Sequence, residues 1–490
     1  MSQIERSILT IIDPSIKLDK LVIPDFESES NKGTGDYSLS KMLGGFWPFI
    51  TINEFVIDYV SLQTFNLDST GFIPKLEFTF YDSNNFFQGR HYPKDGDVVQ
   101  VYIRSNGDED LYKPIRIDFE TIDIYPIAGD GTTTANKFKV EGRMKIPDMY
   151  NEFCEFYEGS SFDSLIDIAE NMGLGFQSNI EQTQDSQIWI NPTDTREKFI
   201  QDITQNSYLD DDSFFNIFID PYYYLTFVER NRIFSTDSDI QVGKTYMSKM
   251  LDAQGTDNVN GTEFPLFLTN IVQLQGTTNH MTKYHLLNNT GQINTLNGYK
   301  RYVQRWDLIN KEFLSEFVDP LTTPGTEGMI HLKGRYIDLD SEPKPEGIAQ
   351  SQSRFKYLGK QDDTVHSNFL FAAILNWQNN QELSKINLNV ELDGINPFFH
   401  RGLRIFVHVM EYNSALRSAL KESGENPGVV ENQAERNESA TVENEQKING
   451  IENEFLTGWY IIDGISYIFR QPGPIKMKLN LVKREFNPST

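Results

Sequence analysis

The residues that could carry chemistry in this chain are few and far apart. Its seven histidines include no pair with the His-x-x-x-His spacing of a helical zinc site. His280 and His285 are five residues apart, so they would point to opposite faces of a single strand. We therefore expect no metal site and no cofactor. The histidines are His91, His280, His285, His331, His366, His400 and His408.

The single cysteine, Cys154, excludes an intrachain disulfide and a zinc site built from several cysteines. Its neighbours are Glu152, Phe153, Glu155 and Phe156. This acidic and aromatic setting disfavours a reactive thiolate. The nucleophile motif Gly-x-Ser-x-Gly is also absent from the sequence. We therefore predict a buried, inert cysteine and no catalytic residues.

Two runs of carboxylates, 108–110 and 210–212, could bind calcium or act as a glycosidase pair. The calcium-loop pattern Asp-x-Asp-x-Asp-Gly and the phosphate-binding pattern Gly-x-x-x-x-Gly-Lys are both absent. Both runs are therefore interpreted as solvated acidic loops. Three consecutive tyrosines at 222–224 could stack on sugar rings or bases, but a strand with one face in a core is the favoured interpretation.

The chain of 490 residues carries a formal net charge of -26. Such acidity opposes binding to the nucleic-acid backbone. It serves either solubility or a surface along which DNA passes without sticking. No segment approaches the roughly 20 apolar residues that cross a bilayer, and the N-terminus lacks the pattern of a signal peptide. We expect synthesis in a cytoplasm and no membrane insertion.

The elements that would hold these residues are mostly strands. Apolar and polar residues alternate over 76–80, 99–103, 115–119 and 138–140, which indicates strands with one buried face. The apolar phase slips after Phe119, which predicts a β-bulge near positions 120 and 121. This region is expected to form an antiparallel barrel or sandwich.

The middle of the chain changes to a helical pattern. Ser160 or Ser161 can cap a helix with apolar residues at helical spacing from Phe162 to Met172, which Gly173 would end. A second helix, around 199–203, and two strands, at 214–219 and 222–228, complete a small α/β domain. Further along, 267–274 and 282–287 resemble strands.

The C-terminal part repeats the order of strands in the first region. Strand patterns at 386–392, 403–409, 459–469 and 475–482 match those of the first region, including a turn with glycine before the second strand. The intervening residues 414–454 are polar enough for a disordered or solvated excursion. The repetition predicts two similar barrels in one chain, and three such chains would present six barrels in a ring.

The predicted fold class is mainly β with α+β insertions, with two tube-like antiparallel β-barrel domains and a small α/β domain. The predicted divisions are an N-terminal arm (1–48), the first barrel (49–154), the α/β domain (155–240), a connecting or insertion domain (241–380) and the second barrel (381–490) with its polar insertion (414–454).

Several stretches resemble the hub proteins of contractile phage baseplates, the family of the T-even phage hub and its distant relatives in type VI secretion spikes. A capped helix follows the first barrel, and a tryptophan, a second helix and a strand pair come next, in the order seen in the family. The similar stretches are 157–179, Trp189, 199–203, 215–228, 456–465 and 479–485.

The resemblance implies a structural baseplate hub of the virion tail and not an enzyme. Such a hub is a homotrimer that joins the sixfold tail tube to the threefold central spike and lines the DNA channel. Its expected partners are tail tube and central spike proteins, with tape measure and baseplate wedge proteins as further candidates. Two alternatives remain open: the hub of another contractile injection machine, and a tail protein that binds or cleaves glycans.

Overall fold

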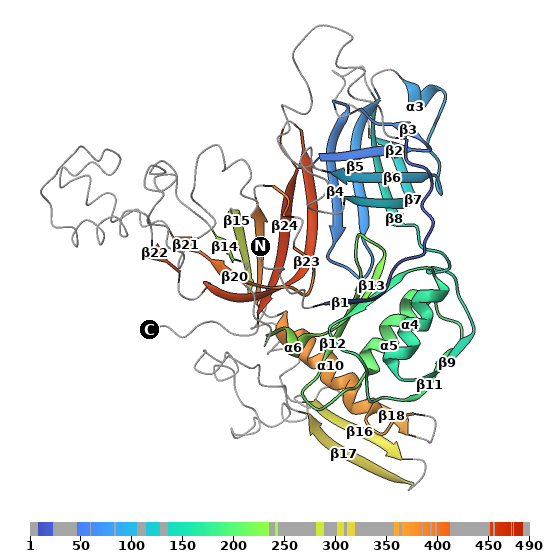
Figure 1. Cartoon of the computed structure of the whole chain (residues 1–490), viewed down its shortest axis with the longest axis vertical. Coiled ribbons are helices and arrows are strands. Elements are labelled where there is room, and N and C mark those ends of the chain that lie inside the picture. The colour runs from blue at the N-terminus through green and yellow to red at the C-terminus, as the bar shows by residue number, and fades with distance from the viewer. Residues whose placement is uncertain are drawn as a thin grey trace, which may run out of the picture.

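A computed structural model of the chain shows a molecule built mainly from antiparallel strands (Figure 1). It describes residues 8–22, 47–58, 60–82, 85–104, 114–127, 136–234, 241–243, 281–288, 301–307, 311–318, 357–361, 365–384, 386–392, 394–396, 399–411, 451–453, 456–471, 473 and 475–483. The predicted strand at 267–274, the acidic run 108–110, and the polar stretch 414–454 apart from 451–453 lie outside these residues.

The first strand-rich region contains seven strands and one short helix. In all four predicted strands the alternating apolar residues are buried on one face, as the period of two requires. The elements are β2 (Trp47–Ile52), β3 (Phe55–Val56), β4 (Leu62–Ser69), β5 (Lys75–Asp82), α3 (Phe86–Gly89), β6 (Val98–Arg104), β7 (Ile115–Ile127) and β8 (Asn136–Met144).

The α/β domain follows, with both predicted helices in place. Ser160 caps α4 by accepting the backbone N–H of Asp163, and Gly173 ends it with a φ of 71°. Thr195 caps α5 in the same way. The elements are β9 (Glu155–Gly159), α4 (Ser161–Asn171), β10 (Gly175–Ser178), β11 (Gln187–Asn191), α5 (Arg196–Asn206), β12 (Phe215–Ile219), β13 (Tyr224–Glu229) and α6 (Arg230–Phe234).

The N-terminal residues run as an extended segment that joins this domain. The strand β1 (Leu9–Ile12) pairs with β10 at the edge of a four-stranded sheet of order β1-β10-β13-β12. Further along, Ser15 donates its backbone N–H to the carbonyl of Gly173 at 3.0 Å. Asp19 donates its backbone N–H to Asp118 of β7 at 3.1 Å.

The C-terminal half supplies the second strand-rich region and a long helix. The helix α10 (Phe369–Leu383) was not predicted from the sequence. The other elements are β14 (Gln241–Gly243), β15 (Met281–Asn288), β16 (Arg301–Asp307), β17 (Glu312–Val318), β18 (Tyr357–Gln361), β19 (Ile386–Leu392), β20 (Arg404–His408), β21 (Met410–Glu411), β22 (Ile451–Glu452), β23 (Gly458–Arg470) and β24 (Lys476–Lys483).

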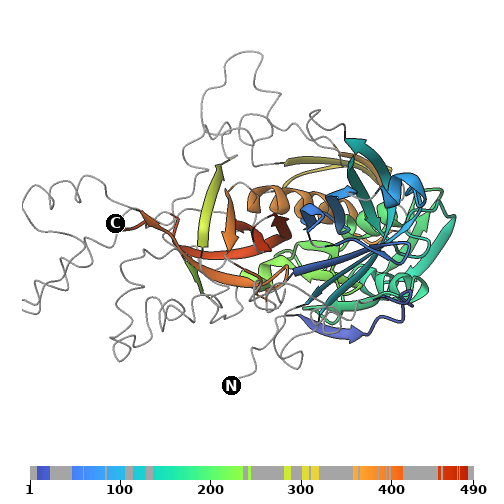
Figure 2. The same ribbon diagram turned by 90° about the horizontal axis from the view of Figure 1, so that it is seen from above.

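The two strand-rich regions share one sheet of thirteen strands, in which β23 of the second region pairs with β4 of the first. In Figure 1, β2, β6 and β7 run across β4 and β5, so the first region folds over its own core. Figure 2 shows the second region, in orange and red, beside the first. The expected fold class, mainly β with two antiparallel strand regions and a small α/β domain, is confirmed, but the two regions are continuous with each other.

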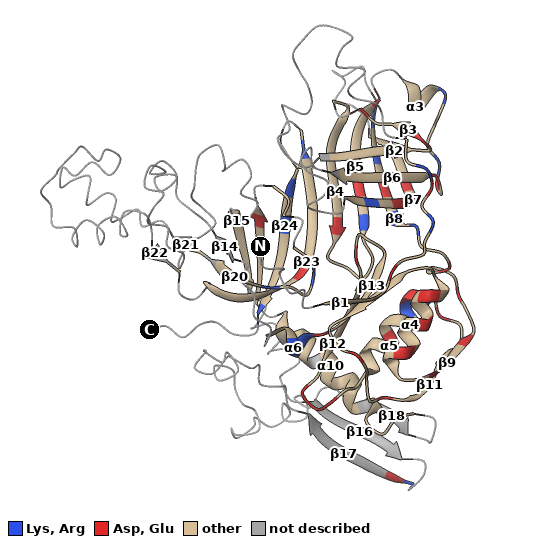
Figure 3. Cartoon of the chain, viewed as in Figure 1, with Lys and Arg blue, Asp and Glu red and all other residues tan. Residues whose placement is uncertain are grey.

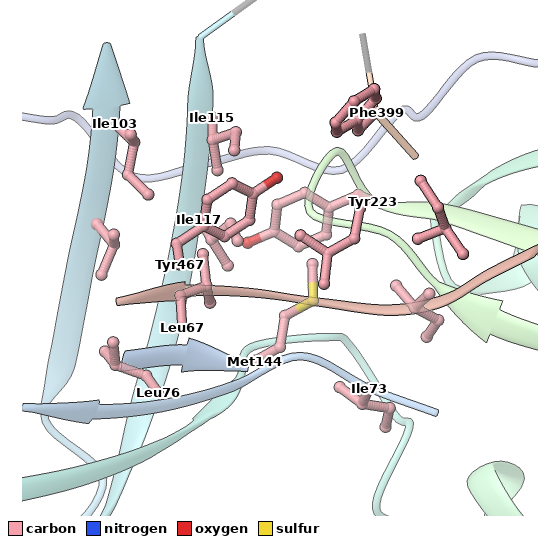
Figure 4. Packing of buried hydrophobic residues seen from close by; sticks show 14 of the residues in the cluster. Leu67, Ile73, Leu76, Ile103, Ile115, Ile117, Met144, Tyr223, Phe399 and Tyr467 are labelled. Atoms are coloured by element: carbon pink, nitrogen blue, oxygen red, sulfur yellow. The ribbon is translucent and has the colours of Figure 1, made fainter. Parts of the chain in front are cut away.

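One hydrophobic core runs through both regions and the α/β domain. Figure 4 shows Tyr467 of β23 and Tyr223 of the α/β domain beside Met144 of β8 and Ile117 of β7. All four side chains are buried. Because a shared core couples the free energies of its parts, we expect the described regions to unfold together.

Candidate functional site

Five strands of the first region have counterparts in the second, in the same order. We call β4, β5, β6, β7 and β8 the first unit, and β15, β19, β20, β23 and β24 the second unit. Within the first unit the sheet order is β4-β5-β8-β7-β6, and within the second it is β15-β19-β24-β23-β20. Every neighbouring pair in both units is antiparallel. The repetition seen in the sequence is therefore a repetition of topology.

The irregularities of the two units also coincide. The outer strands β4 and β15 shift register one residue after their first position, at Gln63 and Thr282. The long strands β7 and β23, each of 13 residues, shift register at Ile122 and Asp463. The bulge predicted at positions 120 and 121 thus lies at Ile122. Bulges re-aim a strand, so matching bulges give the two units matching curvature.

The turn before β6 in the first unit matches the turn before β20 in the second. Gly96 has a φ of 84° and Gly402 a φ of 81°, a region that glycine enters without steric cost. Gly96 donates its backbone N–H to the carbonyl of Thr121 at 2.9 Å. Gly402 donates to Ile462, the counterpart of Thr121, at 2.8 Å. These glycines fix the entry of β6 and β20 beside the long strands.

The joint between the units lies where β23 changes partner. Before Asp463 this edge of β23 pairs with β20, and after it Ile465 to Arg470 pair with Ser69 to Thr64 of β4. A strand that changes neighbours leaves carbonyl groups without a ladder partner, and buried carbonyls need one. The carbonyl of Asp463 lies at this change of partner, and the carbonyl of Gly71 lies just beyond the end of β4, so another residue must supply the donors for both.

Arg401 satisfies both acceptors. Its guanidinium donates to the carbonyl of Asp463 at 2.6 Å and to the carbonyl of Gly71, just beyond β4, at 2.5 Å. The same group lies over the ring of Phe218, 4.0 Å from the centroid. Burial lowers the pKa of Arg401 to about 10, which still leaves it charged at neutral pH. One side chain therefore ties both units to β12 of the α/β domain.

A second arginine closes the same joint. Arg230, at the start of α6, donates to the carboxylate of Asp463 and is itself buried. A cavity of about 480 Å³ lies beside the pair, lined among others by Gly71, Asn376 and Arg401. These arginines bind protein carbonyls and a carboxylate, so the arrangement suits holding elements together.

The helix α10 is fastened to the α/β domain by a buried asparagine. Asn376 accepts the backbone N–H of Phe215 at 2.9 Å and donates to the carbonyls of Gln205 and Ser207, each at 2.9 Å. One side chain thereby supplies hydrogen-bond partners to carbonyl groups at the C-terminal end of α5 and to the N–H of the first residue of β12. The sequence gives little sign of this role, because an asparagine in an apolar segment resembles a helix interruption.

Glu229 is the most perturbed carboxylate of this neighbourhood. It is buried at the end of β13, and its carboxylate accepts the backbone N–H groups of Phe214, Asn231 and Arg232 at 3.1, 2.9 and 2.6 Å. Burial raises its pKa to about 7, while these three hydrogen bonds act in the opposite direction. Its carboxylate therefore joins Phe214, the residue before β12, to the turn into α6.

The tyrosine run is not a strand along its whole length, contrary to expectation. Only Tyr224 lies in β13, while Tyr222 and Tyr223 form the turn before it. Tyr223 has a φ of 65°, and its buried hydroxyl accepts the backbone N–H of Asp118 in β7 at 2.9 Å. The turn results from Asp220, whose carboxylate accepts the N–H groups of Tyr222 and Tyr224. Tyr223 thus anchors the α/β domain on the first unit.

The prediction of a buried cysteine is wrong. Cys154 is exposed, because residues 152–159 alternate strictly between outward and half-buried positions. The inward neighbours Phe153 and Glu155 both contact Arg196, which lies 4.2 Å from the ring centroid and 3.1 Å from the carboxylate. The aromatic packing that was expected to bury the thiol is made on the other face of the segment.

The remaining candidates are scattered. His366 is half-buried with its ring 3.2 Å from the carbonyl of Asn206, and His91 stacks on Phe86. His285 is exposed, and Asp210, Asp211 and Asp212 form an exposed turn. His400 contacts the carbonyl of Arg401, whereas His280 and His331 lie outside the described residues and the side chain of His408 is not described. Among the described residues, no three His, Cys, Asp or Glu side chains gather as a metal-binding group.

Charged residues are spread over many elements. Figure 3 shows acidic residues on α4, α5 and the strands of the first unit, interspersed with basic residues on the strands. In the part of the chain that the structure describes, no helix is both long and apolar enough to span a bilayer.

Comparison with known proteins gives matches among solved structures only. No family model matches the sequence. No curated protein matches it either. A tail protein from Neisseria meningitidis MC58 is 9% identical, with 90% of this chain and 97% of that one covered and a TM-score of 0.44. A 43 kDa tail protein of prophage MuSo2 from Shewanella oneidensis is 9% identical, with 89% and 98% covered and a TM-score of 0.46.

A third structure is an Escherichia coli component of the type VI secretion system, described as similar to bacteriophage tail proteins. It is 7% identical, with 90% of this chain and 79% of that one covered and a TM-score of 0.37. The solved structures similar to this chain thus include tail proteins, one of them from a prophage, and a component of the type VI secretion system.

Proposed function

We propose that this chain is a structural component of a contractile phage tail, the baseplate hub, and that it has no catalytic role. Three copies would place six units in a ring, which joins a sixfold tail tube to a threefold central spike. The observation that carries the proposal is the repeated five-strand unit with its matching bulges and turns. The proposal agrees in kind with the phage tail proteins among the structural neighbours.

The repeat supports an adaptor for a geometric reason. A chain that carries two equivalent units can present six similar surfaces with threefold symmetry, whereas a chain with one unit cannot. The buried joint at Arg401 holds the two units of a chain in one fixed relation. A fixed relation is what a ring of alternating units requires.

The acidity of the chain fits a role beside DNA. With a net charge of -26, the ring would repel the phosphate backbone and let DNA pass through its channel without binding. The partners that follow from the proposal are the tail tube and central spike proteins, and its place is the virion baseplate.

The test is the mass of the purified chain in solution, measured by light scattering over a range of concentrations. The proposal predicts a species of three 56.5 kDa chains. A chain that stays monomeric at every concentration, and also after addition of the tail's spike protein, would overturn the proposal.

A further inference from the structure

The long strand of each unit has one edge that differs between the units. In the second unit, the part of β23 after its bulge pairs with β24 on one edge and with β4 on the other. In the first unit, the part of β7 after its bulge pairs with β8 alone among the described residues. With respect to the described residues, the edge of β7 over residues 123–127 is therefore open where its counterpart in β23 is occupied.

The outer strands show the complementary difference. In the first unit, β4 pairs with β5 on one edge and with β23 on the other. In the second unit, β15 pairs with β19 alone among the described residues. In the described part of each chain, one long strand and one outer strand are thus open, and these are the two kinds of strand that form the joint within the chain.

We propose that the open part of β7 pairs antiparallel with β15 of a second copy of this chain. The inference rests on the proposed ring and names the strands that close it. Transferring the register of the joint through the matched bulges places Ile124 opposite Asn288, Tyr125 opposite Leu287 and Ile127 opposite His285 of the second copy. The contact is head to tail, so it closes into a ring when the rotation between copies allows.

The side chains at this edge are suited to a contact between copies. On the face that carries Ser466 and Asp68, the joint within the chain is polar, since the hydroxyl of Ser466 donates to Asp68 at 3.0 Å. Their counterparts at the open edges are Tyr125 and Leu287, which are 36% and 38% exposed. Ile122, the counterpart of Asp463, is 55% exposed. The proposed pairing would cover the side chains of Tyr125 and Leu287, which is a favourable change in water.

Other differences make the joint between copies weaker than the joint within a chain. Gln471 donates its backbone N–H to the carbonyl of Gln63, so the backbone N–H groups of alternate residues back to Tyr467 point toward β4. Pro126 is the counterpart of Tyr467 and has no N–H, which removes one hydrogen bond from the ladder. Asp95 stands in the place of Arg401, so the hydrogen bonds of the arginine are missing. Asp123 stands in the place of Gly464, so its side chain must turn aside. We therefore expect reversible association.

Disulfide formation between single-cysteine chains tests the register. Because Cys154 is exposed, every variant also carries the substitution Cys154→Ser. Tyr125→Cys chains are then mixed with Leu287→Cys chains and oxidised. The counterparts of these residues, Ser466 and Asp68, form a close pair across the joint, the geometry that a disulfide needs. We expect cross-linked dimers in the mixture at several times the level of either variant alone.

The matched control mixes Tyr125→Cys chains with Lys283→Cys chains. Lys283 is an exposed residue of the same strand, about 13 Å further along β15. Cross-linking should stay at the background level. A second variant, Pro126→Thr, restores the missing N–H and should raise the cross-linked fraction of the productive mixture severalfold. A chain with both Asp68→Cys and Ser466→Cys should form a disulfide within itself, which confirms the oxidation conditions.

The outcomes separate this inference from the proposed function. Selective cross-linking of Tyr125→Cys with Leu287→Cys supports it. Equal or absent cross-linking in both mixtures, while light scattering shows three associated copies, overturns the pairing and leaves the hub intact. A chain that stays monomeric, also after addition of the spike protein, and that forms no cross-links overturns both.

Discussion

Arg401 is the residue on which the joint depends most, because two backbone carbonyls have it as their donor. Replacing it by methionine keeps the packing on Phe218 but leaves both carbonyls unsatisfied. A buried carbonyl without a partner costs roughly 1–3 kcal/mol, so we predict that Arg401→Met lowers the free energy of unfolding by about 2–4 kcal/mol. Urea denaturation of the purified chain measures this change.

The control for that variant is Arg143→Met. The Arg143 side chain is 44% exposed and pairs with Glu120 at 3.3 Å. Exposed ion pairs contribute about 0–1 kcal/mol, so this change should be small. Equal losses for both arginines would contradict the role given to Arg401.

The raised pKa of Glu229 predicts how the free energy of unfolding depends on pH. Burial raises its pKa from 4.5 to about 7, so the folded chain binds more protons than the unfolded chain between those values. The contribution of Glu229 to stability is therefore complete below pH 4.5 and is lost as the pH rises to 7. One pKa unit corresponds to about 1.4 kcal/mol, so the loss is about 3 kcal/mol. Urea midpoints measured from pH 5 to 8 test this, and Glu229→Gln should flatten the slope in that window.

At the scale of elements, the two matching turns provide a comparison inside one chain. Gly96 and Gly402 share a positive φ, so an alanine at either position costs roughly 1–2 kcal/mol in backbone strain. A Cβ at Gly96 meets open space, whereas a Cβ at Gly402 lies 3.3 Å from Ile8. We predict a larger loss of unfolding free energy for Gly402→Ala than for Gly96→Ala in urea denaturation. A larger loss at Gly96 would show that the turns do not bear the same strain.

The strands and capped helices were predictable because their signals are local. Phe78 and Phe80 lie within one alternating or near-alternating pattern, and Ser160 and Gly173 bound a helix by their own chemistry. The joint was not predictable, since Arg401 has the sequence appearance of a surface charge and its acceptors are remote. The helix α10 was not predicted for the same reason, since the hydrogen-bond partners of Asn376 are backbone groups about 170 residues away.

At the scale of the whole molecule, charge should govern association. Each chain carries a net charge of -26, so three copies repel one another as they meet. Salt screens this repulsion, with a Debye length of about 10 Å at 0.1 M. We predict that light scattering shows a larger trimer fraction at 0.5 M than at 0.05 M sodium chloride. A trimer fraction that falls with salt would mean that ion pairs between copies dominate the contact.

The central claim is that one chain supplies two equivalent places in a ring. Electron microscopy of the assembled particle, viewed along its axis, tests it most directly. The account predicts six similar densities around a central channel, contributed by three chains. A ring with only three similar densities, or an assembly without a channel, would contradict it.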